Sequence, residues 1–263
     1  MRKKREIILL VIAILILIAM NYTFLDSFVA KTFSNEETIQ VQRVIDGDTV
    51  VGEGKEGMHY RLLGINTPEK GEKYYTEAKN YTEGLVMNKT LEVETKGKDR
   101  YGRELAYLFY NNENINKEIV REGYANPYFP EGKDNYYYQF RDAWEECIAN
   151  NVNLCEKSLD RCAECIQLRE WNFDTQKVEL YNNCGFSCNL DGWTIKDEGR
   201  KKFIFEDFNL QGFEGVSIIV GDKTDTEERL YWKGESYVWT YTGDTIFLRD
   251  REGGLVLWKT KGY

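Results

Sequence analysis

The pattern of expected secondary structure changes once along this chain of 263 residues, at about Cys165, and this change constrains the fold most. Before that point, segments with alternating apolar residues are interspersed with segments whose apolar residues recur at helical spacing. Beyond it, no segment has convincing helical spacing, and short apolar runs recur between turn residues. The sequence therefore predicts an α+β unit followed by an all-β unit.

The first unit, residues 35–158, is expected to contain five strands and three helices. The strands cover residues 38–45, 49–51, 59–65, 91–94 and 105–110. The helices cover residues 75–87, 115–123 and 135–150. Five strands in this order among three helices fit a small barrel with helices packed against it.

The second unit, residues 159–263, is expected to form a β-sandwich. Seven short strands are predicted, at residues 177–181, 193–196, 203–205, 216–220, 237–241, 245–249 and 255–259. Short strands that recur with turn residues between them are typical of two packed antiparallel sheets.

Residues 1–34 precede both units and have the composition of an export signal. Basic residues at positions 2–5 are followed by the uninterrupted apolar run Ile7–Met20. No convincing cleavage site follows, so the segment is either a cleaved signal peptide or a retained membrane anchor. In both cases the rest of the chain is expected outside the cytoplasm, secreted or held at the membrane by this segment.

All six cysteines lie near the junction of the two units, at Cys147, Cys155, Cys162, Cys165, Cys184 and Cys188. Disulfides persist outside the reducing cytosol. The spacing of the last four cysteines is also compatible with a four-sulfur zinc site. The expected location favours disulfides, but the sequence does not select their pairing.

The composition restricts the chemistry that the chain can perform. Because His59 is the single histidine, a zinc site with several histidines is excluded and a Ser-His-Asp or Cys-His centre is disfavoured. The net charge is −9, so any binding of nucleic acid must be local. Carboxylates, arginines, tyrosines or a metal ion held by oxygen ligands remain available.

Three short strings in the first unit carry such groups at the ends of predicted strands: residues 44–50 (VIDGDTV), 61–69 (RLLGINTPE) and 99–107 (DRYGRELAY). Taken singly, each is explained by a turn, a strand end or a helix cap. Taken together, they offer oxygen ligands for a hard cation, two arginines for a phosphate and a carboxylate that can accept a proton. This combination predicts metal-assisted hydrolysis of a phosphodiester.

The three strings, in this order of strands and helices, resemble the staphylococcal-nuclease (thermonuclease) family over residues 38–158. The resemblance implies a five-stranded OB-fold barrel that cleaves DNA and RNA with Ca²⁺ and leaves 3′-phosphate ends. The metal ligands that it implies are Asp48, Asn66 and the main-chain carbonyl of Thr67. The catalytic residues that it implies are Arg61, Glu69 and Arg103. The substrate-binding residues that it implies are Tyr101 and a stacking aromatic at Tyr128 or Phe129.

Asn66 departs from the best-known members of the family, which have a second aspartate ligand there. An amide keeps one oxygen donor but removes one negative charge, and fewer charged ligands mean weaker Ca²⁺ binding. The sequence therefore predicts an active nuclease with an increased Ca²⁺ requirement.

The second unit resembles the lamin-tail domain in residues 178–183 (VELYNN), 190–197 (LDGWTIKD) and 241–248 (YTGDTIFL). This resemblance implies an immunoglobulin-like sandwich and identifies no catalytic residue, so the partner of this unit stays unknown. The main hypothesis is an exported Ca²⁺-dependent nuclease for DNA, RNA or both. The alternatives are a barrel that binds nucleic acid without cleaving it, and a protein that binds the cell envelope.

Overall fold

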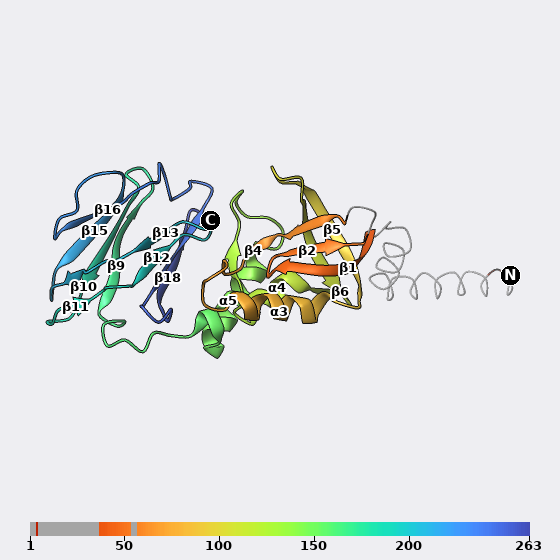
Figure 1. Cartoon of the computed structure of the whole chain (residues 1–263), viewed down its shortest axis with the longest axis horizontal. Helices are drawn as coiled ribbons and strands as arrows, with labels where there is room; N and C mark the ends of the chain where they lie inside the picture. Colours follow the sequence, from red (N-terminus) through yellow and green to blue (C-terminus); the bar gives the residue numbers. More distant parts are fainter. Residues whose placement is uncertain (1–3, 5–36, 54–56) are drawn as a thin grey trace.

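The computed structural model describes residue 4, residues 37–53 and residues 57–263, which form two domains side by side (Figure 1). Apart from residue 4, the predicted signal or anchor segment lies outside the described residues. Within the described part of the chain, no helix is long and apolar enough to cross a membrane.

Five strands of the first domain close into a barrel: β1 (Glu37–Asp46), β2 (Thr49–Gly52), β3 (His59–Leu62), β5 (Thr90–Lys98) and β6 (Glu104–Tyr110). Strand β1 pairs with β2 and β5, and the ring closes because β3 pairs with β6 in parallel. Three shorter strands accompany the barrel: β4 (Gly64–Asn66), β7 (Glu113–Asn114) and β8 (Asn126–Tyr128). The predicted OB-fold barrel is confirmed.

Three helices pack against the barrel, each close to its predicted position: α3 (Tyr75–Val86), α4 (Ile115–Arg121) and α5 (Tyr137–Asn150). Helix α5 buries Phe140 and Trp144, which are four residues apart and therefore lie on one face of the helix. Asn114 caps the N-terminus of α4, because its side chain accepts a hydrogen bond from the N–H of Lys117 at 3.1 Å.

The second domain contains two four-stranded sheets, as the sandwich prediction requires. One sheet consists of β9 (Ile166–Asn172), β10 (Lys177–Asn182), β15 (Gly215–Val220) and β16 (Arg229–Trp232). The other consists of β12 (Thr194–Lys196), β13 (Lys202–Ile204), β17 (Asp244–Arg249) and β18 (Leu255–Lys261). A separate pair is formed by β11 (Cys188–Asn189) and β14 (Asn209–Leu210).

Two features of the sandwich differ from the prediction. Strands β9 and β16 and the short pair β11 and β14 had no predicted counterpart, and residues 237–241 form no strand. Val238 and Trp239 are buried there, but their N–H groups donate to the side chain of Gln176 at 2.7 and 2.9 Å. A side-chain acceptor thus replaces the neighbouring strand that the apolar pattern suggested.

All six cysteines form disulfides, which confirms that interpretation over the zinc site. The pairs are Cys147–Cys155, Cys162–Cys188 and Cys165–Cys184, with Cα–Cα distances of 5.8, 5.7 and 5.3 Å. The first disulfide lies in the first domain, and the other two join the turn that precedes β9 to β11 and to the segment before it.

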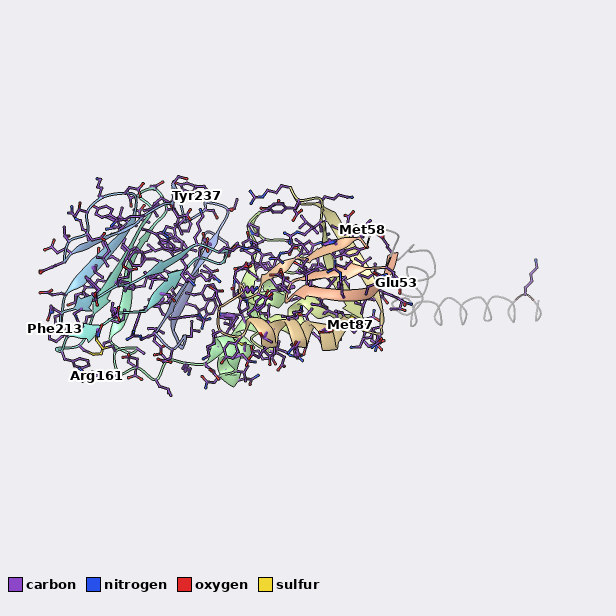
Figure 2. All side chains as sticks on the ribbon, in the orientation of Figure 1. Glu53, Met58, Met87, Arg161, Phe213 and Tyr237 are labelled. Carbon is purple, nitrogen blue, oxygen red and sulfur yellow. A yellow bond between two sulfur atoms is a disulfide. The ribbon has the colours of Figure 1, made fainter. Side chains whose placement is uncertain are left out.

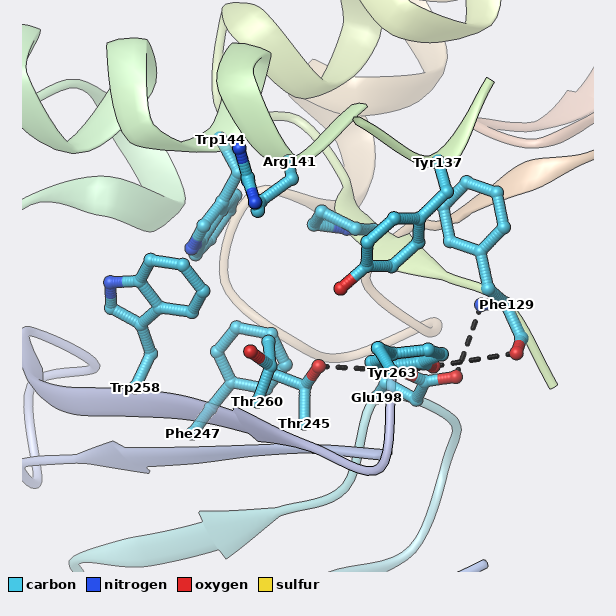
Figure 3. A pocket seen from close by; sticks show the side chains of 11 residues that line it. Phe129, Tyr137, Arg141, Trp144, Glu198, Thr245, Phe247, Trp258, Thr260 and Tyr263 are labelled. Atoms are coloured by element: carbon cyan, nitrogen blue, oxygen red, sulfur yellow. Dashed lines mark hydrogen bonds between the residues drawn. The ribbon is translucent and has the colours of Figure 1, made fainter. Parts of the chain in front are cut away.

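The sheet that contains β12, β17 and β18 faces the first domain (Figure 1). Trp144 of α5 packs edge-to-face on Phe247 and Trp258, with ring centroids 5.5 and 6.4 Å away. The ring of Tyr137 lies 4.7 Å from that of Tyr263. These side chains surround a cavity of about 10 Å³, no larger than about one water molecule (Figure 3). The two domains are therefore closely packed around these aromatic side chains, whereas a larger pocket of about 210 Å³ lies between them near Glu72 and Lys196.

Candidate active site

Asp48 joins the first two of the three strings. It lies in the tight turn between β1 and β2 and is only 3% exposed. Its Oδ2 accepts hydrogen bonds from the N–H and the hydroxyl of Thr67, both at 3.0 Å, and lies 3.2 Å from Nη2 of Arg61. The register that pairs Thr49 of β2 with Arg61 of β3 brings these groups together. Arg61 also donates to the carbonyl of Ile65 at 2.9 Å, which fixes its orientation.

Arg103 links the third string to the same carboxylate. Its Nη1 donates to the hydroxyl of Thr49 at 3.3 Å, and that hydroxyl donates to Oδ1 of Asp48 at 3.2 Å. Its Nε donates to Asp99 at 2.7 Å within the turn that precedes β6. Burial alone would raise the pKa of Asp99, but the bonds from Arg103 hold it below its usual value. Both predicted phosphate-binding arginines thus belong to one network around Asp48.

The three predicted substrate-binding aromatics lie in different environments. Tyr101 is 69% exposed, and its ring centroid lies 5.6 Å from the guanidinium of Arg103. The ring of Phe129 is buried, with edge-to-face contacts to Tyr137 and Phe140. Phe129 is therefore a core residue and is not placed to stack on a base, whereas Tyr128 is half-buried at the end of β8.

The donor atoms fit a hard cation by their chemistry, since a carboxylate, an amide and a main-chain carbonyl are all oxygen ligands. Among the described residues, no three histidine, cysteine, aspartate or glutamate side chains cluster as a metal site. The Oδ1 of Asp46 accepts the N–H of Asp48 at 3.2 Å and so stabilises the turn between β1 and β2. Burial and then the neighbouring Asp48 raise the pKa of Asp46. Of the three predicted ligands, Asp48 is the one that carries a negative charge.

A loop of the second domain, residues 197–201 between β12 and β13, lies against this site. The side-chain amide of Asn126 donates to the carbonyl of Glu198 at 2.9 Å. The Glu198 carboxylate accepts the N–H of Phe129 at 3.0 Å and the hydroxyl of Tyr263 (Figure 3). No local sequence pattern indicates these contacts, because the partners lie 65 to 72 positions apart.

The same loop explains why an amide suits position 66. The Nδ2 of Asn66 donates to the carbonyl of Gly199 at 2.6 Å and lies 3.5 Å from the carbonyl of Glu198. An aspartate carboxylate cannot donate, so it would place oxygen against oxygen in a buried position. The contact also orients the side chain through its nitrogen and leaves the amide oxygen available.

The predicted general base, Glu69, lies in the turn that follows β4. Its side chain is 47% exposed, and its Oε1 lies 2.8 Å from Nε of Arg200. Glu72 braces this turn, because it accepts the N–H of Glu69 at 2.9 Å and pairs with Lys202 at 2.9 Å and Lys196 at 3.4 Å. Burial alone would raise the pKa of Glu72, but the two lysines lower it to about 2. The sequence alone did not indicate the contacts of Glu69 with Arg200 and Glu72. It also did not indicate the ion pairs of Glu72 with Lys196 and Lys202.

The first domain is an OB-fold barrel in which Asp48, Arg61 and Arg103 belong to one hydrogen-bonded network. The family model described as "Staphylococcal nuclease homologue" matches residues 59–157, and the model described as "Lamin Tail Domain" matches residues 164–262. Both agree with the order of domains expected from the sequence.

Individual relatives point to the same family. The thermonuclease of Staphylococcus hyicus is 36% identical over 147 residues, which span 51% of this chain and 85% of that protein. The thermonuclease of Staphylococcus intermedius is 32% identical over 163 residues, or 57% of this chain and 96% of that protein. An uncharacterized endonuclease of Haemophilus influenzae is 35% identical over 121 residues, or 45% and 66%. The chain belongs to the staphylococcal nuclease family, and it is a nuclease.

Proposed function

We propose that this nuclease is an extracytoplasmic, Ca²⁺-dependent enzyme that hydrolyses phosphodiester bonds in DNA, RNA or both. The observation that carries the proposal is the continuous network from Arg103 through Thr49 to Asp48, and from Asp48 to Arg61 and Thr67. This network supports a single site that combines two guanidinium groups with oxygen ligands suited to Ca²⁺.

In this site, Arg61 and Arg103 bind the phosphodiester and stabilise the negative charge that develops on it. Glu69, at the solvent-exposed side of the site, accepts a proton from the attacking water. Asp48, Asn66 and the carbonyl of Thr67 would hold the cation, which when bound polarises a phosphoryl oxygen. Tyr101 lies beside the terminal phosphate, and Tyr128 stacks on a base.

The proposed cellular location rests on two features outside the site, the disulfides and the apolar run near the N-terminus. Three disulfides support an oxidising compartment, because such bonds are rare in the cytosol. The apolar run at residues 7–20 is proposed to direct export and either to be cleaved or to hold the chain at the membrane.

Cleavage of labelled DNA and RNA by the oxidised full-length chain tests the proposal. We expect cleavage at millimolar Ca²⁺ and none with a chelator. Arg103→Ala should lower kcat by about 100-fold or more, as removal of one charge-stabilising donor does. Arg121→Ala, which removes a surface arginine paired with Glu118 on α4, is the matched control and should leave kcat unchanged. A wild type that binds nucleic acid but never cleaves it would contradict the proposal in favour of the binding-only alternative.

A further inference from the structure

The second domain places one cationic side chain at the exposed side of the active site. Arg200 lies in the loop between β12 and β13, with its side chain 62% exposed and its Nε 2.8 Å from Oε1 of Glu69. The rest of this guanidinium faces solvent beside the residue proposed to activate water.

The backbone around Arg200 is fixed from both sides. Gly199 is bound through its carbonyl to Asn66, and Glu198 is bound to Phe129 of the first domain. On the other side, the N–H of Lys201 donates to Asp197 at 2.8 Å. The loop therefore holds Arg200 at the site through contacts that do not involve its own side chain.

The neighbouring cation is engaged within the second domain. The ammonium of Lys201 lies 3.6 Å from the ring centroid of Tyr237, at the surface of that domain (Figure 2), and donates to the Tyr237 carbonyl. It also pairs with Glu235 at 3.5 Å. Of these two adjacent cations, Arg200 is thus the one that contacts Glu69, the proposed general base of the first domain.

The ion pair between Arg200 and Glu69 is easily exchanged, because both side chains are largely exposed and such pairs contribute little. A phosphodiester held by the two arginines of the first domain would bring a second anion to the same place. Guanidinium groups bind phosphate through paired hydrogen bonds, and a local cation matters in a chain whose net charge is −9.

We propose that Arg200 binds a backbone phosphate of the nucleic acid, so that the two domains share the substrate site. The inference rests on the proposed nuclease site of the first domain. Transfer of the guanidinium from Glu69 to phosphate also frees the Glu69 carboxylate to accept a proton when substrate is bound.

The test uses the oxidised full-length chain and a fluorescent single-stranded oligonucleotide. Affinity is measured by fluorescence anisotropy over a range of salt concentrations with a chelator present, and kcat/KM is measured separately with Ca²⁺. Arg200→Ala should weaken binding by about three- to tenfold and reduce the slope of log K against log salt by about 0.7, the value for one lost contact to a single strand. Arg200→Lys should keep the salt slope, because it keeps the charge.

The matched control is Arg229→Ala, the same substitution at an exposed residue of β16, on the side of the sandwich away from the first domain (Figure 1). It should change neither affinity nor slope. An unchanged slope for Arg200→Ala overturns the inference. An increased kcat with unchanged affinity also overturns it, and would identify Arg200 as a restraint on Glu69. A wild-type protein that binds the oligonucleotide without cleaving it would contradict the proposed nuclease activity. In that case a reduced salt slope for Arg200→Ala would still support phosphate binding by Arg200.

Discussion

At the scale of single residues, contacts with main-chain atoms and a hydroxyl orient the side chains that are proposed to bind the metal ion and the phosphate. Arg61 is held by carbonyls of its own domain, and Asp48 is held by the N–H and hydroxyl of Thr67. Asn66 differs, because its partner is the carbonyl of Gly199 in the second domain. The side chain that departs from the family pattern thus contacts the added domain.

Asn66→Asp should therefore have two separate effects. A carboxylate against the carbonyl of Gly199 should lower the free energy of unfolding by about 1–3 kcal/mol in the absence of divalent ions. The added charge should lower the Ca²⁺ concentration for half-maximal cleavage. Denaturant unfolding with a chelator measures the first effect, and a Ca²⁺ titration of activity measures the second.

Asn183→Asp, an exposed site in the second domain, is the matched control for Asn66→Asp and should change neither quantity. Unchanged stability of Asn66→Asp would contradict the contact with Gly199. An unchanged Ca²⁺ requirement would mean that position 66 does not bind the metal.

At the scale of elements, the turn after β4 and the loop between β12 and β13 form one connected unit. Glu72 accepts the N–H of Glu69, and it pairs with Lys196 at the end of β12 and Lys202 at the start of β13. A turn of the first domain that carries the proposed general base is thereby held by a hairpin of the second.

Glu72→Gln should lower the free energy of unfolding by about 1–2 kcal/mol at pH 7, because two lysines lose a partly buried partner. The pKa of Glu72 is lowered from 4.5 to about 2, so its contribution is complete above about pH 4.5 and is lost as the pH falls towards 2. Denaturant unfolding at pH 7 and pH 3 measures this. The difference from wild type should shrink at pH 3, whereas Glu83→Gln, an exposed change on α3, should have no effect at either pH. A difference that is independent of pH would argue against these ion pairs.

Some secondary-structure elements could be predicted from the sequence and others could not. Helices α3, α4 and α5 were predicted within a few residues, because their apolar spacing is local. Residues 237–241 were wrongly predicted as a strand, because an apolar pattern reports burial and not the identity of the hydrogen-bond partner. In the site, the strings that contain Asp48, Arg61 and Arg103 were found because each is contiguous in sequence.

At the scale of the whole molecule, carboxyl groups are buried at the domain interface. Burial raises the pKa of Glu198 to about 8, that of Asp197 to about 7 and that of Asp244 to about 6, and the charge of Asp244 reinforces the first two shifts. Because the folded protein binds these protons more tightly than the unfolded chain does, its stability should fall as the pH rises from about 4.5 to 8 and then level off.

Glu198→Gln should remove part of this pH dependence, since the amide keeps the shape and carries no charge. We expect the variant to be more stable than wild type at pH 8, by an amount on the order of 1–3 kcal/mol, and to differ less at pH 5. Thermal and denaturant unfolding across this range measure the effect. Glu206→Gln, an exposed change in the same domain, should show no such trend. Equal destabilisation by Glu198→Gln at both pH values would contradict a protonated, buried Glu198.

The sequence by itself determined the two domains, their classes, most of their elements and the three strings that make up the nuclease site, because these features depend on local periodicity and contiguous motifs. Only the tertiary structure decided the disulfide pairing, the burial of Phe129, the partners of Asn66 and Glu69, and the position of Arg200 beside the site. The contacts between the domains join residues more than 100 positions apart in several cases, as with Asn66 and Gly199. Such contacts arise from the packing of one domain on the other, and no local pattern of residue types encodes that packing.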